Sequence, residues 1–221
     1  MRWTIPNTLT TMRLLAALGV PVMFLYFHRP TADWFALALF VSAAITDYFD
    51  GYLARLWKQE SKFGTMLDPI ADKAMVVIAL LILTGYSGMN PWLILPASVI
   101  LFREVFVGGL REFLGAKAGL LKVTRLAKWK TTAQMVAIAV LFLGTGLEHI
   151  EGIARQGLTI EQYASLVGKG LADPIRSCGT RGCSSYATWA GLTLIWIAAV
   201  MTAVTGLDYF VKSLPYLRDD T

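Results

Sequence analysis

Four aspartates lie within a stretch of 26 residues that is preceded and followed by apolar sequence. They form two pairs, and the spacing within each pair places both members on one face of a helix. Carboxylates are costly beside hydrocarbon and tend to face a polar cavity, so these residues are candidates for function. Clustered carboxylates repel one another, and a ligand set made only of oxygen suits Mg²⁺, Mn²⁺ or Ca²⁺ rather than Zn²⁺. The pairs are Asp47 with Asp50 and Asp68 with Asp72.

Two glycines belong to the same stretch. Gly51 directly follows Asp50 and leaves room for a ligand to approach the backbone. Gly64 lies in residues 61–64, which we expect to form the turn between two helices, one for each aspartate pair.

Eight positions of this stretch resemble the complete signature of the CDP-alcohol phosphotransferases. They are Asp47, Asp50, Gly51, Ala54, Arg55, Gly64, Asp68 and Asp72. The resemblance implies a dimeric membrane enzyme of six helices that joins an alcohol to the phosphatidyl group of a CDP-linked lipid and releases CMP. It also implies that the aspartates hold two divalent metals, Mg²⁺ or Mn²⁺, and that Asp72 is the base that accepts the hydroxyl proton. Gly51, Ala54, Arg55 and Gly64 would then line the site of the CDP-lipid.

The composition is typical of an integral membrane protein. Of the 221 residues, 56% are hydrophobic and only 16% are charged, which argues against a soluble domain. The net charge of +5 fits contact with anionic lipid and with phosphorylated substrates. Nucleic acid is not an expected partner, because no basic helix or combination of aromatic and basic residues supports it.

The apolar segments predict an all-α membrane protein with six transmembrane helices in a single domain, residues 1–221. We expect the first apolar run to be a membrane helix and not a cleaved signal peptide. A polar outer loop is expected at residues 144–188, with a short surface helix at 159–167 that is capped by Thr159 and Gln162. Cys178 and Cys183 could close a small disulfide loop there. The expected spans are residues 14–27 with the turn before them, 34–52, 68–85, 91–114, 131–143 and 189–210.

The first helix opens on a segment that carries Asn7 and Arg13. One interpretation is a capped interfacial segment in which Arg13 extends to lipid headgroups. This opening also resembles the family's pattern, where it helps to bind the nucleotide, so both residues are candidates for the CDP-lipid site.

Charged residues also interrupt the fourth span and precede the fifth. An arginine deep in an apolar helix should pair inside the bundle or line a cavity. A buried Arg–Glu pair that fixes packing is one interpretation of Arg103 and Glu104. The other is an anion site, because guanidinium groups match the geometry of phosphate. Lys73 is either a counter-charge or a residue that extends to headgroups. The candidates for a phosphate pocket are Arg103, Arg111, Lys128 and Lys130.

Six spans place most basic residues on one side of the membrane. That side carries all of the 20 lysines and arginines except Arg29, Arg155, Lys169, Arg176 and Arg181. The positive-inside rule makes it cytoplasmic, so we expect a multi-pass protein of the cell inner membrane whose active site faces the cytoplasm.

The cations near the aspartates favour a phosphorylated acceptor over a neutral polyol. Residues 5–143 most resemble the bacterial members of the family that transfer the phosphatidyl group from CDP-diacylglycerol to sn-glycerol 3-phosphate. Other acceptors remain open, namely inositol phosphate, serine and phosphatidylglycerol. A metal-ion transporter is a different class, but the aspartates are expected at one membrane surface and not at mid-depth. A structural membrane protein without activity is a third class.

Overall fold

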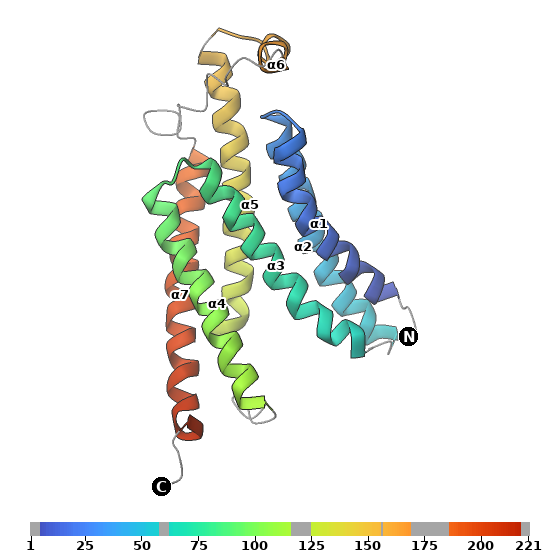
Figure 1. The fold of residues 1–221 in the computed structure, drawn as a ribbon, viewed down its shortest axis with the longest axis vertical. Helices are drawn as coiled ribbons and strands as arrows, with labels where there is room; N and C mark the ends of the chain where they lie inside the picture. Colours follow the sequence, from blue (N-terminus) through green and yellow to red (C-terminus); the bar gives the residue numbers. More distant parts are fainter. Residues whose placement is uncertain (1–4, 58–61, 116–124, 156, 169–185, 218–221) are drawn as a thin grey trace.

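The computed structural model describes residues 5–57, 62–115, 125–155, 157–168 and 186–217, and within these ranges all the regular structure is helical (Figure 1). Six of the helices are long, with 22 to 32 residues each, and α6 is short. The helices are α1 Ile5–Tyr26, α2 Thr31–Trp57, α3 Lys62–Tyr86, α4 Pro91–Leu114, α5 Arg125–Arg155, α6 Ile160–Gly168 and α7 Tyr186–Leu217.

Four helices of the described chain are long and apolar enough to cross a membrane. They contain Asn7–Tyr26, Pro91–Leu114, Trp129–Arg155 and Tyr186–Leu217. Large apolar side chains are exposed on the outside of these helices, and Val105 on α4 is 77% exposed. An apolar exterior of this kind suits contact with lipid. The chain is therefore an all-helical membrane protein, and α2 and α3 do not meet the same criteria.

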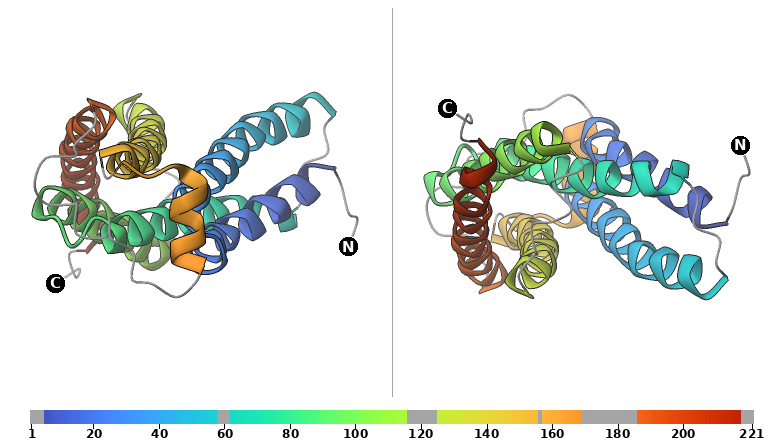
Figure 2. Two further views of the ribbon diagram at one scale, coloured as in Figure 1. Left: turned by 90° about the horizontal axis from the view of Figure 1, so that it is seen from above. Right: turned by 90° about the horizontal axis from the view of Figure 1, so that it is seen from below.

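The helices form two groups that diverge toward one end of the molecule. In Figure 1, α1 and α2 lie side by side and α3 runs between them and the group of α4, α5 and α7. Figure 2 shows α1, α2 and α3 leaning away from that second group in both views along the long axis. The start of α1, the end of α2 and the start of α3 all lie at the far end of the first group. The end of α4, the start of α5 and the end of α7 lie at the same end of the molecule.

Small residues allow the helices of the second group to pack closely. A Cβ atom on Gly191 of α7 would lie 2.8 Å from the Leu141 side chain of α5, and one on Gly144 would lie 2.9 Å from the backbone nitrogen of Thr188. Behind these contacts lies one apolar core, which includes Phe40, Leu80, Ile100, Ile138 and Ile195. This apolar core holds together the helices that carry the charged residues near their ends.

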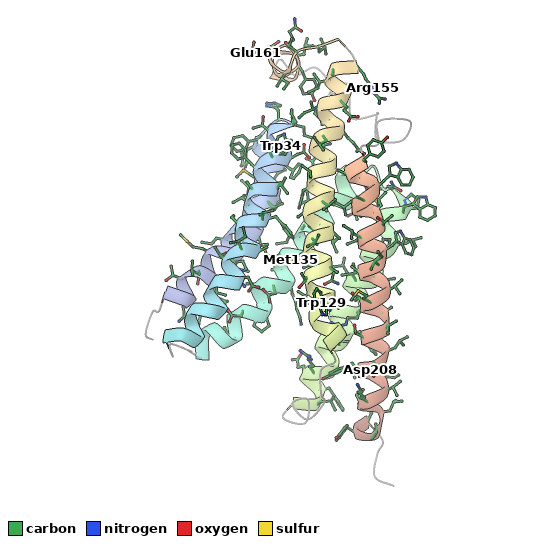
Figure 3. The ribbon with its side chains drawn as sticks, turned by 180° about the vertical axis from the view of Figure 1, so that it is seen from behind. Trp34, Trp129, Met135, Arg155, Glu161 and Asp208 are labelled. Carbon is green, nitrogen blue, oxygen red and sulfur yellow. The ribbon has the colours of Figure 1, made fainter. Side chains whose placement is uncertain are left out.

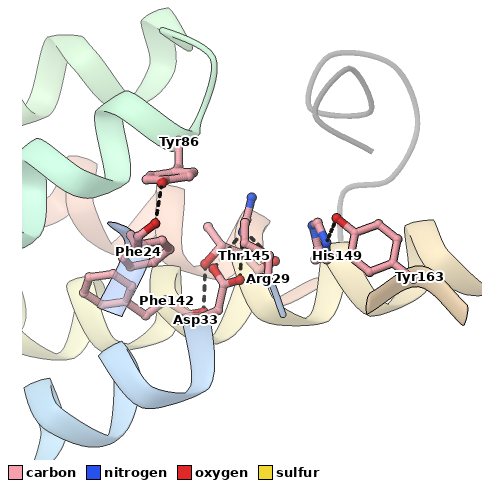
Figure 4. Close-up of polar contacts among 8 residues, drawn as sticks. All are labelled: Phe24, Arg29, Asp33, Tyr86, Phe142, Thr145, His149 and Tyr163. Carbon is pink, nitrogen blue, oxygen red and sulfur yellow. Dashed lines mark hydrogen bonds and ion pairs between the residues drawn. The ribbon is translucent and has the colours of Figure 1, made fainter. Parts of the chain in front are cut away.

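Polar contacts tie the other end of the molecule together (Figure 4). Arg29 donates two hydrogen bonds of 2.8 Å to Asp33 and one of 3.2 Å to the carbonyl of Thr145 on α5. His149 on α5 and Tyr163 on α6 share a hydrogen bond of 3.1 Å. These contacts join α2, α5, α6 and the segment between α1 and α2, and Figure 3 shows Trp34 and Glu161 near this end.

The expected α4 is confirmed residue for residue. Asn90 caps its start by accepting a hydrogen bond of 3.0 Å from the backbone nitrogen of Trp92, and Pro91 occupies the first turn. Gly115 closes it with a φ of 51°, a conformation that favours glycine. The expected capping of α6 is confirmed as well, because Thr159 and Gln162 exchange hydrogen bonds of 3.0 and 3.2 Å.

An expected turn and part of an expected loop were wrong. Helix α3 begins at Lys62, so Gly64 is a buried position inside a helix and not part of a turn. Helix α5 continues to Arg155, so residues 144–155, which we assigned to the loop, are helical. Gly144 and Gly146 suggested a loop, yet they are the points where α7 and α2 approach α5.

Candidate functional site

Arg13 of α1 lies between two of the aspartates. Its Nη1 atom is 2.5 Å from Asp47 Oδ1 on α2 and 3.0 Å from Asp72 Oδ1 on α3. The two carboxylate oxygens therefore cannot be further apart than the sum of these distances. The Arg13 side chain is 1% exposed, whereas both carboxylates are 44% exposed. Arg13 is thus a buried counter-charge and does not extend to headgroups.

Thr10 brings in the third aspartate. Its hydroxyl donates a hydrogen bond of 2.7 Å to Asp68 Oδ1. Thr10 and Arg13 are three residues apart and share a face of α1, and Asn7, three residues earlier, is also buried. One face of α1 therefore organises the carboxylates of α2 and α3, and the sequence had given no role to Thr10.

Four other candidate site residues of the signature lie toward the end of α2. The backbone of Asp50, Gly51, Ala54 and Arg55 is helical there, but their side chains lie outside what the structure describes. Asp47, Asp68 and Asp72, which we call the acidic cluster, are the described members. The expected disulfide between Cys178 and Cys183 also lies outside the described residues.

The acidic cluster has the chemistry of a site for a hard divalent cation. Its donors are carboxylate oxygens, and Asp72 is close enough to Asp47 and Asp68 to feel the charge of both. One cationic group, the Arg13 guanidinium, already lies between two of the carboxylates. Among the described side chains no three acidic, histidine or cysteine residues form a ready ligand set. Asp47, Asp68 and Asp72 are therefore the described residues that could hold such a cation.

A second charged cluster lies between α4 and α5. Glu104 Oε1 accepts a hydrogen bond of 3.0 Å from Arg103 Nη1 and one of 2.5 Å from Lys130 Nζ. Lys130 is 4% exposed, and the buried Nε atom of Arg103 has no hydrogen-bond partner among the described residues. Arg103 also crosses to α7, where a Cβ atom on Gly206 would lie 2.8 Å from its Cγ. The expected Arg–Glu pair is present, and it holds a second cation as well.

Two more cations extend this second cluster. The charge of Lys73 on α3 acts on Glu104, and the charge of Arg111 acts on Lys130. The guanidinium of Arg111 lies over the ring of Tyr209, 5.3 Å from its centre. We call Lys73, Arg103, Arg111 and Lys130 with Glu104 the basic cluster. The side chain of Lys128, expected in the same pocket, lies outside the described part of α5.

Helix α7 supports the basic cluster in a way that the sequence had not indicated. One turn beyond Lys130, Gln134 of α5 donates a buried hydrogen bond of 3.0 Å to Thr202 of α7. Thr202 lies one turn before Gly206, the point at which Arg103 meets α7. Threonine and glycine are common in membrane helices for packing alone, so nothing in their types pointed to this position.

Comparison with known proteins identifies the family of this chain. The family model described as CDP-alcohol phosphatidyltransferase matches residues 3–168. A Cereibacter sphaeroides protein named CDP-diacylglycerol–glycerol-3-phosphate 3-phosphatidyltransferase is 80% identical over 220 residues, which cover 100% of both chains. Proteins of the same name match from Rickettsia bellii, at 36% identity over 96% of both chains, and from Escherichia coli K12. The latter is 43% identical over 64% of this chain and 78% of its own length. The chain therefore belongs to the CDP-alcohol phosphatidyltransferase family.

Proposed function

We propose that this protein transfers the phosphatidyl group of CDP-diacylglycerol to sn-glycerol 3-phosphate, forming phosphatidylglycerophosphate and CMP. The family membership and the names of the full-length relatives support this reaction. The observation that carries the choice of acceptor is the basic cluster. Three cationic side chains act on Glu104, and Arg111 adds a fourth positive charge near Lys130, so positive charge exceeds negative charge in a partly buried place. A phosphate monoester would balance that excess, whereas a neutral polyol would leave it uncompensated.

We assign different groups of the two substrates to the two clusters. Lys73 follows Asp72 directly on α3, so the acidic and basic clusters are adjacent. We assign the diphosphate of the CDP-lipid to the acidic cluster, together with Asn7, Arg13 and the glycines of the signature. We assign the phosphate of the acceptor to four residues of α4 and α5, namely Arg103, Arg111, Lys128 and Lys130. This division brings the free hydroxyl of the acceptor toward the carboxylates.

In the proposed step the acceptor hydroxyl attacks the phosphorus of the phosphatidyl group. The bond from that phosphorus to the oxygen bridging to CMP breaks, and CMP leaves with that oxygen. Asp72 takes the proton from the attacking hydroxyl as general base. Arg13 holds Asp72 and Asp47 in place through its two contacts, and Thr10 holds Asp68. Two divalent metals, Mg²⁺ or Mn²⁺, when bound by the four aspartates, would neutralise the diphosphate charge.

The same proposal covers the place of the protein in the cell. Six of the helices, α1 to α5 and α7, would span the inner membrane as one domain, with an outer segment between α5 and α7. The ends that carry both clusters would face the cytoplasm, because they also carry most of the lysines and arginines. The family resemblance favours a homodimer.

An acceptor panel tests the proposal. Purified protein in detergent would be given CDP-diacylglycerol with Mg²⁺ or Mn²⁺, and CMP release would be measured with each acceptor separately. Glycerol 3-phosphate, glycerol, inositol phosphate, serine and phosphatidylglycerol form the panel, and glycerol is the matched control because it lacks only the phosphate. We expect CMP with glycerol 3-phosphate alone. CMP with a different acceptor, or with glycerol at a similar rate, would overturn the assignment.

A further inference from the structure

Lys73 ends at the surface of α4 although it belongs to α3. A Cβ atom on Gly108 of α4 would lie 3.3 Å from Lys73 Nζ. The amine therefore occupies space that is open because residue 108 has no side chain. A lysine that merely extended to lipid headgroups would have no reason to end beside a particular glycine of a neighbouring helix.

Gly108 lies within the charged face of α4. It is four residues after Glu104 and three residues before Arg111, so all three positions share one side of the helix. The charge of Lys73 acts on Glu104, which already accepts hydrogen bonds from Arg103 and Lys130. Lys73 adds positive charge to this face. No hydrogen bond or ion pair of its own fixes its amine there among the described residues.

Asp72, the residue before Lys73, points in a different direction from the axis of α3. Consecutive residues of a helix project about 100° apart, so one turn of α3 serves both clusters. Asp72 contacts Arg13 within the acidic cluster, while the Lys73 amine lies at α4. The backbone of α3 thus fixes the distance between the proposed base and this amine.

We propose that Lys73 is a specificity-determining residue whose amine binds the phosphate of the acceptor at the junction of the two clusters, in the space that Gly108 leaves open. This inference rests on the proposed function and adds a residue from α3 to the phosphate pocket. Arg103 and Lys130 already contact Glu104, whereas Lys73 is an exposed residue whose amine has three hydrogen-bond donors. A phosphate held by Lys73 has its orientation set relative to Asp72, because the two residues are neighbours in the chain.

Steady-state kinetics of four variants would test the inference. Lys73→Gln removes the charge and keeps a hydrogen-bonding side chain of similar size, and Lys73→Arg is the conservative change. Gly108→Ala places a methyl group against the amine. Gly109→Ala is the matched control, because a Cβ atom there meets nothing within 4 Å. For each variant we would measure kcat, the KM for glycerol 3-phosphate, the KM for CDP-diacylglycerol, and inhibition by inorganic phosphate.

For Lys73→Gln we expect the KM for glycerol 3-phosphate to rise about tenfold to a hundredfold, as for the loss of a charged hydrogen bond. The inhibition constant of inorganic phosphate should rise in parallel, while the KM for CDP-diacylglycerol stays near the wild-type value. The KM of Lys73→Arg for glycerol 3-phosphate should be much closer to that of wild type than to that of Lys73→Gln. The KM of Gly108→Ala for glycerol 3-phosphate should lie between those of wild type and Lys73→Gln, and the KM of Gly109→Ala should equal that of wild type.

An unchanged KM for glycerol 3-phosphate in Lys73→Gln would overturn the inference, and so would an equal rise for both substrates. If Lys73→Gln does not fold, Gly108→Ala and Gly109→Ala still test the inference. Equal KM values of these two variants for glycerol 3-phosphate would reject it. CMP release by the wild-type protein distinguishes a failure of this inference from a failure of the proposed function. Absence of CMP release from wild type with glycerol 3-phosphate would refute the proposed function itself.

Discussion

Replacing Arg13 by methionine should destabilise the protein, and divalent metal should restore much of the loss. The change removes a guanidinium that is 1% exposed and that contacts Asp47 and Asp72 at 2.5 and 3.0 Å. Methionine has a similar length and is apolar, so it fills much of the same space. The two carboxylates are then left facing each other without their shared counter-charge.

The size of the effect follows from the exposure of the partners. A hydrogen bond to a charged group contributes about 1.5–3 kcal/mol when it is buried, and Arg13 makes two such contacts. Both carboxylates are 44% exposed and can partly rehydrate, so about half of the full value remains. We expect a loss of about 2–3 kcal/mol, which corresponds to a fall in Tm of about 5–10 °C for a chain of this size.

The assay is thermal unfolding in detergent, first with EDTA and then with millimolar Mg²⁺. Arg13→Lys keeps one positive charge and should lose less. The exposed pair between Lys212 and Asp208 on α7 provides the control. Its side chains are 40% and 41% exposed, so Lys212→Met should change stability by less than about 1 kcal/mol.

Added Mg²⁺ should raise the Tm of Arg13→Met more than that of wild type, because a cation at the acidic cluster replaces the missing counter-charge. Equal stability of Arg13→Met and wild type in EDTA would refute the view that Arg13 stabilises this cluster. The absence of a Tm increase with Mg²⁺ in both proteins would refute the view that the three carboxylates form a cation site.

Three further changes address the base, the phosphate pocket and the packing. Asp72→Asn should lower kcat by about 100-fold or more with an unchanged elution profile, since it removes the proposed proton acceptor, and a rate near that of wild type would exclude that role. Arg111→Ala should raise the KM for glycerol 3-phosphate about tenfold and leave that for CDP-diacylglycerol nearly unchanged, and parallel changes would count against a dedicated phosphate pocket. Gly144→Ala should destabilise the protein by about 1–3 kcal/mol, because its Cβ would lie 2.9 Å from the backbone of Thr188. Gly85→Ala, where a Cβ meets nothing within 4 Å, should be neutral or stabilising, so equal Tm values for these two alanine variants would contradict the packing explanation.

The helices and the acidic cluster were accessible from the sequence because their signals are local. Long apolar runs, the cap at Asn90 and the spacing of Asp68 and Asp72 each depend on residues within one or two turns. The expected fourth helix and the capping of α6 by Thr159 and Gln162 were confirmed for this reason.

The errors and omissions concern contacts between helices. Gly144 was taken for a loop residue because glycine disfavours helices, but its role is to let α7 approach α5. The position of the Lys73 amine depends on Gly108, which lies 35 residues away in the chain and on another helix. For Arg13 the sequence allowed a headgroup contact or a place in the CDP-lipid site, and only the approach of α2 and α3 to α1 shows that it is a buried counter-charge.

The most direct test of the proposed reaction follows the oxygen of the acceptor. Wild-type protein would be given CDP-diacylglycerol and glycerol 3-phosphate that carries ¹⁸O in its free primary hydroxyl, and both products would be analysed by mass spectrometry. Attack of that hydroxyl on the phosphatidyl phosphorus predicts a phosphatidylglycerophosphate that retains the label and a CMP without it. Label in CMP, or CMP formed without a labelled lipid, would contradict phosphatidyl transfer to this acceptor.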